Sequence, residues 1–258
     1  MDDGMNQGEV CGPDGCAVPD NASASPMPLG REPAAVTRVD VISDAICPWC
    51  WVGKRNLDRA LSILAEDGEA FDVHWRPFQL NPEMPRAGVE RASYRAAKFG
   101  SLERSAAADA RVAQAGAVAG LEFRHDRMLR TPNTVDAHRV VHLAGALGLQ
   151  HEVVERLFQA YFQEGVDVGD RAELARLAGE AGMDAEEVAE FLASDALEAE
   201  VVAEDAQFRA GGLSGVPTFA LAGHVLFSGA MPAEDMAEAF QKGLRILRER
   251  GVVPARGA

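Results

Sequence analysis

Two cysteines separated by two residues, Cys47 and Cys50, form the pattern in this sequence with the most definite chemistry. Thiols at this spacing can close into a disulfide and open again, so the pair can accept or donate two electrons. An apolar stretch with strand character, 36–42, precedes the pair, and a segment with helical spacing, 51–64, follows it. Cys47 is therefore expected where a strand ends and a helix begins, a position at which free N–H groups and the helix dipole favour a thiolate.

The two sulfur atoms are expected to have different roles. Cys47, at the helix start, is expected to be the more exposed and to attack a substrate disulfide, or, when oxidised, to accept electrons from a substrate dithiol. Cys50, one helical turn later, would then attack the mixed disulfide and release the product. Pro48 fits the first turn of a helix, and Trp49 can shield the pair or form part of a docking surface. The alternatives are half of a zinc site and two inert core thiols.

A second candidate element is the segment 215–219, in which Val216 and Pro217 open a strand. We expect a cis Val216–Pro217 bond that faces the cysteine pair and leaves the backbone of Val216 free to bind an extended substrate by strand addition. Because few X–Pro bonds are cis in folded proteins, an ordinary proline at a strand start is the alternative.

Four further residues lie near these candidates in the sequence. Asp44 and Lys54 flank the cysteine pair, where each either tunes the ionisation of the thiols or is a solvated loop charge. Trp51 and Trp75 are expected to pack in the core or at its rim.

The elements that position these residues follow from hydrophobic periodicity. Strands are expected at 36–43, 71–78, 216–221 and 224–227, with a hairpin turn at 222–223. Helices are expected at 49–66, 88–98, 101–119, 134–148, 150–164, 170–182, 185–194, 196–210 and 233–249. The expected N-cap residues are Asn133, Asp170, Asp184 and Asp195.

The order of these elements predicts an α/β protein with a thioredoxin-like fold and an inserted all-helical domain. Residues 36–87 and 211–252 supply a βαβ unit and a ββα unit, which together make the thioredoxin-like domain. Residues 88–210 form the inserted helical domain. Residues 1–35 are rich in Gly, Pro, Ser, Asn and Asp and are expected to be a flexible N-terminal tail.

Five motifs carry a resemblance to a known family, namely 44–54, 76–82, 131–134 with 137–139, 162–167 with Asp170, and 215–219. The chain resembles the DsbA-like family of the thioredoxin superfamily, in particular its FrnE-like branch, over about residues 37–249. The resemblance implies a thioredoxin fold interrupted by a helical domain, a thiol–disulfide oxidoreductase or isomerase activity, and a cis proline at Pro217.

The same resemblance suggests a role for the predicted helix start near residue 134 and allows a comparison with related enzymes. It implies that Asn133, Thr134 and His138 overhang the active site and help to bind substrate; the alternative is an N-cap and a surface histidine. The superfamily also contains 2-hydroxychromene-2-carboxylate isomerases and kappa-class glutathione transferases, which carry serine at the position of Cys47. The thiol in this chain disfavours glutathione-dependent isomerisation or conjugation, but glutathione can still serve as a reductant.

A second cysteine pair, Cys11 and Cys16, lies in the predicted tail on either side of a Pro–Asp–Gly turn. Three interpretations stay open: a second redox pair that exchanges with Cys47 and Cys50, four thiols that bind one zinc ion, or no defined role. His138 and His142 lie one turn apart without an evident third ligand, so neither a metal site nor a cofactor is predicted.

Charge and composition exclude some classes of partner. The net charge is −15, from 25 basic and 40 acidic residues, which argues against binding to nucleic acid or to anionic membranes. No apolar run approaches the roughly 18–20 residues of a membrane span, and the acidic, polar N-terminus does not resemble a secretory signal. A cytoplasmic protein, monomeric or homodimeric, is therefore expected.

The leading hypothesis is a cytoplasmic dithiol–disulfide oxidoreductase or isomerase that acts on protein disulfides. The first alternative is an enzyme of the same fold that acts on a small thiol or a polyketide-like molecule. A peptide-wide groove beside Pro217 would favour the first, and a closed pocket under the helical domain the second. A holdase chaperone is the third possibility, and its activity would persist without either thiol.

Overall fold

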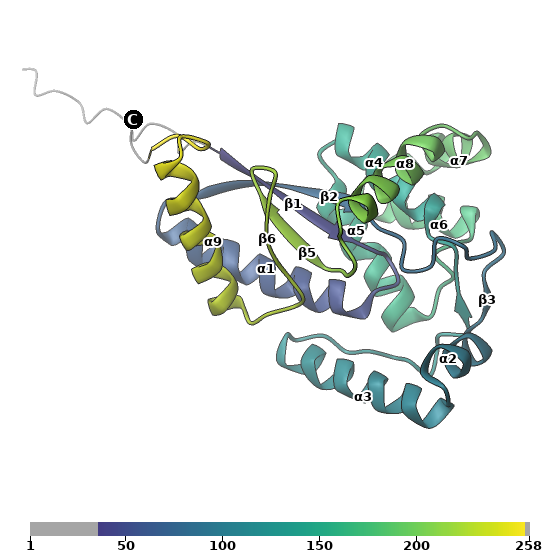
Figure 1. Ribbon diagram of the computed structural model, residues 1–258. Helices are drawn as coiled ribbons and strands as arrows, with labels where there is room; N and C mark the ends of the chain where they lie inside the picture. The colour runs from purple at the N-terminus through teal and green to yellow at the C-terminus, as the bar shows by residue number, and fades with distance from the viewer. Residues whose placement is uncertain (1–35, 256–258) are drawn as a thin grey trace, which may run out of the picture. The chain divides into compact units, whose positions relative to one another are not determined.

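The computed structural model describes residues 36–255, which belong to one compact unit. The predicted tail, with Cys11 and Cys16, lies outside the described residues, so the predictions made for it are not tested. Among the described residues, four strands form the main sheet in the order β2-β1-β5-β6 (Figure 1).

Strand β1 (Val36–Ser43) lies inside the sheet, between its parallel neighbour β2 (Ala70–Pro77) and its antiparallel neighbour β5 (Thr218–Leu221). Strand β6 (His224–Ser228) pairs with β5 and forms one edge. Along β1, Thr37, Val39 and Val41 are buried on one face, while the side chains between them are more exposed at the start of the strand. One face of β1 is therefore buried along the whole strand.

Two amphipathic helices pack together against this sheet, α1 (Pro48–Glu66) and α9 (Ala233–Glu249). They bury apolar stripes at helical spacing, made of Leu57, Ala60 and Leu64 in α1 and of Met236, Phe240 and Leu244 in α9. All four predicted strands and both of these helices are confirmed, with bounds shifted by two residues at most at each end.

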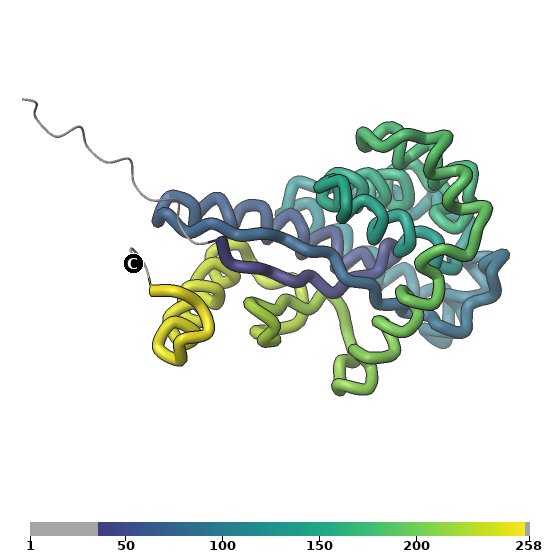
Figure 2. Tube along the Cα trace, turned by 90° about the horizontal axis from the view of Figure 1, so that it is seen from above, coloured from purple at the N-terminus to yellow at the C-terminus, as the bar shows by residue number. Residues whose placement is uncertain are grey.

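Seven α-helices lie between β2 and β5: α2 (Arg91–Phe99), α3 (Leu102–Val118), α4 (Val135–Ala146), α5 (Gln150–Gln159), α6 (Arg171–Glu180), α7 (Ala185–Ala193) and α8 (Glu198–Ala210). Figures 1 and 2 show α4 to α8 gathered beside one end of the sheet and α9 at the other end, and Figure 1 shows α3 running below α1. This arrangement confirms the predicted α/β fold with a helical insertion. Within the described part of the chain, no helix is both long and apolar enough to cross a membrane.

Two features of the insertion were not predicted. Strands β3 (Val89–Glu90) and β4 (Arg130–Thr131) pair antiparallel, but each has only two residues, too few for an alternating pattern to show. The predicted helix at 150–164 changes at its end into a π-helical turn, η1 (Ala160–Glu164), which Gly165 terminates with a φ of 77°. Glycine adopts this left-handed conformation without the steric cost of a Cβ atom.

Two of the four predicted N-caps are confirmed and two are wrong. Asp170 and Asp184 accept hydrogen bonds from the first N–H groups of α6 and α7. Asn133 lies one residue too early, because Thr134 is the N-cap of α4, and the Asn133 side chain instead accepts from Val135 N at 3.0 Å. Asp195 is wrong because α8 begins only at Glu198, after Leu197 has turned the chain with a φ of 62°.

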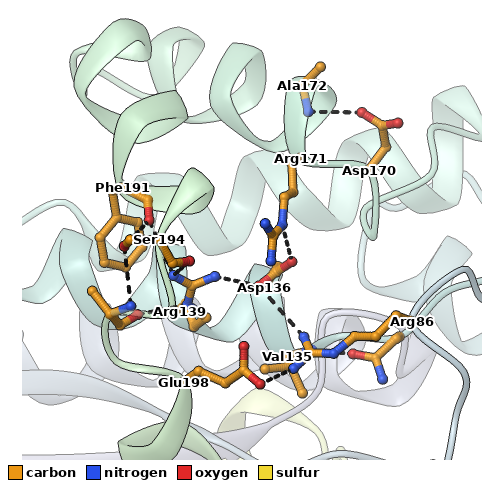
Figure 3. A network of polar contacts seen from close by, with 12 residues as sticks. Arg86, Val135, Asp136, Arg139, Asp170, Arg171, Ala172, Phe191, Ser194 and Glu198 are labelled. Atoms are coloured by element: carbon orange, nitrogen blue, oxygen red, sulfur yellow. Dashed lines mark hydrogen bonds and ion pairs between the residues drawn. The ribbon is translucent and has the colours of Figure 1, made fainter.

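A charged network centred on Asp136 joins α4 to α6 and to the connection between α7 and α8 (Figure 3). Asp136, on α4, forms ion pairs with Arg139 at 2.6 Å, with Arg171 at 2.7 Å and with Arg86 at 3.7 Å. Arg139 is fully buried and donates hydrogen bonds to three backbone carbonyls at the end of α7 and before α8, those of Phe191, Ser194 and Ala196. Burial alone would raise the pKa of the Asp136 carboxyl, but Arg171 and Arg139 outweigh burial and lower it.

Replacing Asp136 by Asn is expected to destabilise the fold by about 3 kcal/mol at neutral pH, because Arg139 would remain charged and buried without its carboxylate. The lowered pKa gives the sign of the pH effect. The carboxylate contribution is complete above the unfolded-state pKa of about 3.9 and is lost as the pH falls through the lower folded-state value. Urea unfolding of both proteins at neutral and acidic pH measures this difference, which should shrink in acid.

Arg171→Gln is the matched control, since it removes a partner of the same carboxylate that is itself half exposed. Its expected cost is below about 1 kcal/mol. Equal losses in the Asp136 and Arg171 variants, or a loss that does not change with pH, would contradict the role given to the buried pair.

Candidate active site

The first cysteine lies at the helix start, as predicted. Cys47 is the N-cap residue of α1 in an extended backbone conformation, and Pro48 is the first helical residue. Two turn hydrogen bonds of 3.0 Å hold this segment, from Cys47 N to Asp44 O and from Cys50 N to Cys47 O. The chain thus passes directly from the end of β1 through a tight turn into α1.

Both thiols are free, and their surroundings differ. Each cysteine is buried, Cys47 with 4% and Cys50 with 1% of its surface exposed, but only Cys47 lines a cavity. Burial, together with the hydrogen bond and charge of Cys47, raises the pKa of the Cys50 thiol well above its usual value. The raised pKa favours the protonated form of Cys50 at neutral pH, and Cys47 is the cysteine that borders the cavity.

The partner of the Cys47 thiol differs from the expected one. Its Sγ donates a hydrogen bond of 3.6 Å to the Val216 carbonyl oxygen, whereas its side chain accepts none from the N–H groups of the helix. The Val216–Pro217 bond is cis, which confirms that prediction. The Val216 carbonyl, expected to be free for an extended substrate, is thus already bonded to the thiol.

A glycine allows this close approach between α1 and the proline segment. A Cβ atom placed on Gly53 would lie 2.9 Å from Cγ of Pro217 and 3.3 Å from Cζ of Phe219. The first distance is shorter than carbon atoms tolerate, so any larger residue must push the Pro217 ring away. Gly53 therefore helps to set the position of the Val216 carbonyl relative to Cys47.

A cavity of about 450 Å³ opens beside Cys47. One wall is formed by Ile46, Cys47, Pro48 and Trp49, and Trp49 is 39% exposed. The facing walls come mainly from the insertion, with Arg91, Tyr94, Arg95, Lys98 and Phe99 of α2, Ala108, Asp109, Arg111 and Val112 of α3, and His125, Met128, Thr131, Tyr161 and Phe162 beyond them. Leu80 and Asn81 complete it.

The basic residues of α2 were not predicted to belong to the site, although their spacing in the sequence shows a pattern. Arg91, Arg95 and Lys98 are spaced by four and three residues, which places them on one face of a helix. Only the position of that face opposite Cys47 marks these residues as part of a site.

Asn133, Thr134 and His138 do not lie at this cavity. All three are buried, and none of them lines it. Asn133 donates a hydrogen bond of 2.7 Å to the Met84 carbonyl. His138 Nε2 lies 3.5 Å from Asp44 Oδ1 without forming a hydrogen bond. Their substrate-binding role therefore has no support from the geometry.

The charges that flank the cysteines are buried, so the alternative of solvated loop charges is wrong for both. Asp44 accepts hydrogen bonds from Leu80 N at 2.6 Å and from Ile46 N at 3.4 Å. Lys54 instead contacts three side chains away from the thiols, those of Asp58 at 3.1 Å, Glu155 at 3.2 Å and His151 at 2.7 Å. Asp44 thus shapes the turn before Cys47, and Lys54 joins α1 to α5.

The two tryptophans pack in the core, as predicted. Trp51 is fully buried and stacks on Phe162 with ring centroids 5.8 Å apart, and Trp75 is 3% exposed. Across residues 36–255, no group of three or more His, Cys, Asp or Glu side chains is arranged to hold a metal ion.

Comparisons with known proteins agree with this fold. A family model described as "DSBA-like thioredoxin domain" matches residues 38–241. A probable DsbA oxidoreductase from Streptomyces coelicolor is 33% identical, with a TM-score of 0.73 over 81% of this chain and 90% of that one. The cytosolic disulfide reductase DsbM from Pseudomonas aeruginosa, solved with GSH, is 22% identical, with a TM-score of 0.58 over 81% of this chain and 99% of that one, which shows the fold alone.

A curated relative is the uncharacterized protein YwbO from Bacillus subtilis, which is 30% identical over 146 residues. The match covers 57% of this chain and 66% of YwbO, just under two thirds of that protein's length.

Replacing Gly53 by Ala is expected to slow the reaction of the dithiol protein with dithiodipyridine by about tenfold, because the new Cβ displaces Pro217 and with it the carbonyl that holds the Cys47 thiol. Stopped-flow absorbance of the released pyridinethione gives the rate. Gly145→Ala is the control, since its Cβ would meet only the Gln150 side chain, at 3.1 Å, and neither residue lines the cavity beside Cys47. Unchanged rates in both variants would show that the Gly53 contact does not position the thiol.

Proposed function

Because the chain belongs to the family of DSBA-like thioredoxin domains, we propose that it is a thiol–disulfide oxidoreductase whose redox couple is Cys47 and Cys50. One observation carries the proposal: of two thiols at the start of α1, one lines a cavity and the other is sealed beneath it. The motif at 44–54 supports the FrnE-like branch of the family.

The dithiol form reduces a disulfide in two exchange steps. The Cys47 thiolate attacks one sulfur of the substrate, so that a Cys47–substrate disulfide forms, the substrate S–S bond breaks and the first product leaves as a thiol after taking up a proton. Cys50 then gives up its proton and attacks Cys47 Sγ, which releases the second product thiol. The substrate gains two electrons, and the protein ends with a Cys47–Cys50 disulfide.

The raised pKa of Cys50 explains why Cys47 attacks the substrate first and Cys50 attacks second. A thiol that remains protonated does not compete with Cys47 for the substrate. Once Cys47 is held in a mixed disulfide, Cys50 is the adjacent thiol, one helical turn away, and an intramolecular attack is favoured by its proximity. The same steps in reverse oxidise a substrate dithiol.

The cavity supports a low-molecular-weight disulfide as substrate. Its volume of about 450 Å³ lies within the range of small-molecule sites, and helices α2 and α3 of the insertion supply about half of its lining residues. Val216 and Pro217, beside which a peptide-wide groove would favour a protein substrate, do not line it. Protein disulfides, the substrate class expected from the sequence, remain the second candidate.

Cys47→Ser is expected to abolish reduction of both insulin and a small disulfide, because the remaining thiol is buried. Cys50→Ser is expected to accumulate a mixed disulfide on Cys47, since the group that releases it is gone. Thiol release measured by absorbance and intact-protein mass spectrometry report the two results. Full activity in Cys47→Ser would remove the redox proposal, and suppression of aggregation that persists with both cysteines replaced would favour a holdase instead.

The rate of release from the mixed disulfide is expected to keep rising with pH up to and beyond 9, the ordinary thiol pKa. Burial, the largest cause of the raised pKa of Cys50, persists after Cys47 has reacted, so only a small and pH-dependent fraction of Cys50 is ionised. Rapid-quench mass spectrometry from neutral to alkaline pH measures this step. A rate that levels off below pH 8 would show that Cys50 ionises more easily than its burial allows.

A further inference from the structure

The cavity beside Cys47 is basic in a protein whose net charge is −15. Four cationic side chains line it, Arg91, Arg95, Lys98 and Arg111, against the single carboxylate of Asp109. Local charge of one sign in a cleft attracts ligands of the other sign. The excess of positive charge therefore indicates that the cavity favours a negatively charged ligand.

The Asp109 carboxylate neutralises only part of this charge. Its two oxygens are shared between Arg91, at 2.9 Å, and Arg95, and all three side chains are largely buried. Burial, with help from the charges of Arg91 and Arg95, lowers the pKa of His125, so this histidine is neutral at neutral pH. Together the four groups carry one net positive charge.

Lys98 and Arg111 face the cavity without a carboxylate partner in the described part of the chain. Lys98 Nζ donates a hydrogen bond of 2.8 Å to Tyr94 Oη and lies 5.3 Å from the Tyr94 ring. Arg111 forms neither an ion pair nor a side-chain hydrogen bond with any residue in 36–255. The cavity thus has two cations without a carboxylate partner, Lys98 on α2 and Arg111 on α3. They add to the one net positive charge of the cluster around Asp109.

We infer that the substrate of this site is a low-molecular-weight disulfide that carries carboxylates, with Lys98 and Arg111 binding its charged ends while Cys47 attacks its S–S bond. The inference rests on the proposed function. Guanidinium and ammonium groups form charge-assisted hydrogen bonds with carboxylates, and arginine can do so through two parallel bonds. A cationic disulfide would instead meet four like charges, which Asp109 alone does not offset.

Three small disulfides of similar length and different charge test this inference. Dithiodipropionate is dianionic, bis(hydroxyethyl) disulfide is neutral and cystamine is dicationic at neutral pH. Each is mixed with the dithiol protein in a single turnover, in which the protein supplies both electrons and the Cys47–Cys50 disulfide is the product. Released thiol gives the rate, which is divided by the rate of the same disulfide with free dithiothreitol to correct for intrinsic reactivity.

The expected order is anionic, neutral, cationic, with at least a tenfold span between the extremes at low ionic strength. Added salt should narrow the span, because the charges at the cavity are partly open to solvent. In the double variant Lys98→Gln, Arg111→Gln the ratio of anionic to neutral rates should fall toward one. Arg104→Gln is the matched control, an exposed arginine of α3 that does not line the cavity, and its ratio should equal that of the unaltered protein.

Different results of these experiments would contradict the charge preference and the redox function. Corrected rates that do not depend on substrate charge, or a double variant that keeps the preference, would overturn the inference and leave the redox function standing. No protein oxidation by any of the three disulfides would overturn the inference, and failure to reduce insulin as well would remove the redox function itself. Melting temperatures of the variants show whether each has folded, and the salt dependence of the unaltered protein tests the charge preference without any substitution.

Discussion

The close packing of the first turns of α1 against the Val216–Pro217 segment is the constraint on which the site depends. At Gly53 the two segments approach so closely that there is no room for a Cβ atom. This contact brings the Val216 carbonyl within 3.6 Å of Cys47 Sγ, and the same packing leaves Cys50 only 1% exposed. The difference between an accessible and a sealed thiol therefore comes from how the helix is seated, because both cysteines belong to the same turn of chain.

The insertion completes the site from the opposite side. The thioredoxin-like elements supply Cys47 and the turn around it, while α2 and α3 supply the cations across the cavity. Largely buried ion pairs join the two helices of this second wall, because Arg91 and Arg95 of α2 share the carboxylate of Asp109 on α3. The proposed redox couple and the cations across the cavity thus lie on different parts of the fold, so the lining of α2 and α3 can change without altering the dithiol.

Errors in the predictions made from sequence have a common origin. Asn133 and Asp195 are good capping residues, but whether a given side chain caps depends on where the chain turns. Leu197 turns the chain directly before α8 begins, two residues after Asp195. Asp44 and Lys54 look like loop charges because their neighbours are polar or small. Their burial results from partners far along the chain, such as Leu80 and Glu155. Local patterns do not contain these contacts.

The sequence by itself determined the strands of the sheet, the helices α1 and α9, the helical insertion and the place of Cys47 at a helix start. These features follow from periodicities of two and 3.6 residues and from short-range motifs, which act within a few residues. Only the tertiary structure decided that Cys50 is sealed and that His138 lies beside Asp44, away from the cavity. It also decided that Arg91, Arg95, Lys98 and Arg111 line the same cavity as Cys47. The physical reason is that burial and electrostatic neighbourhood depend on segments distant in the chain, which no local pattern specifies.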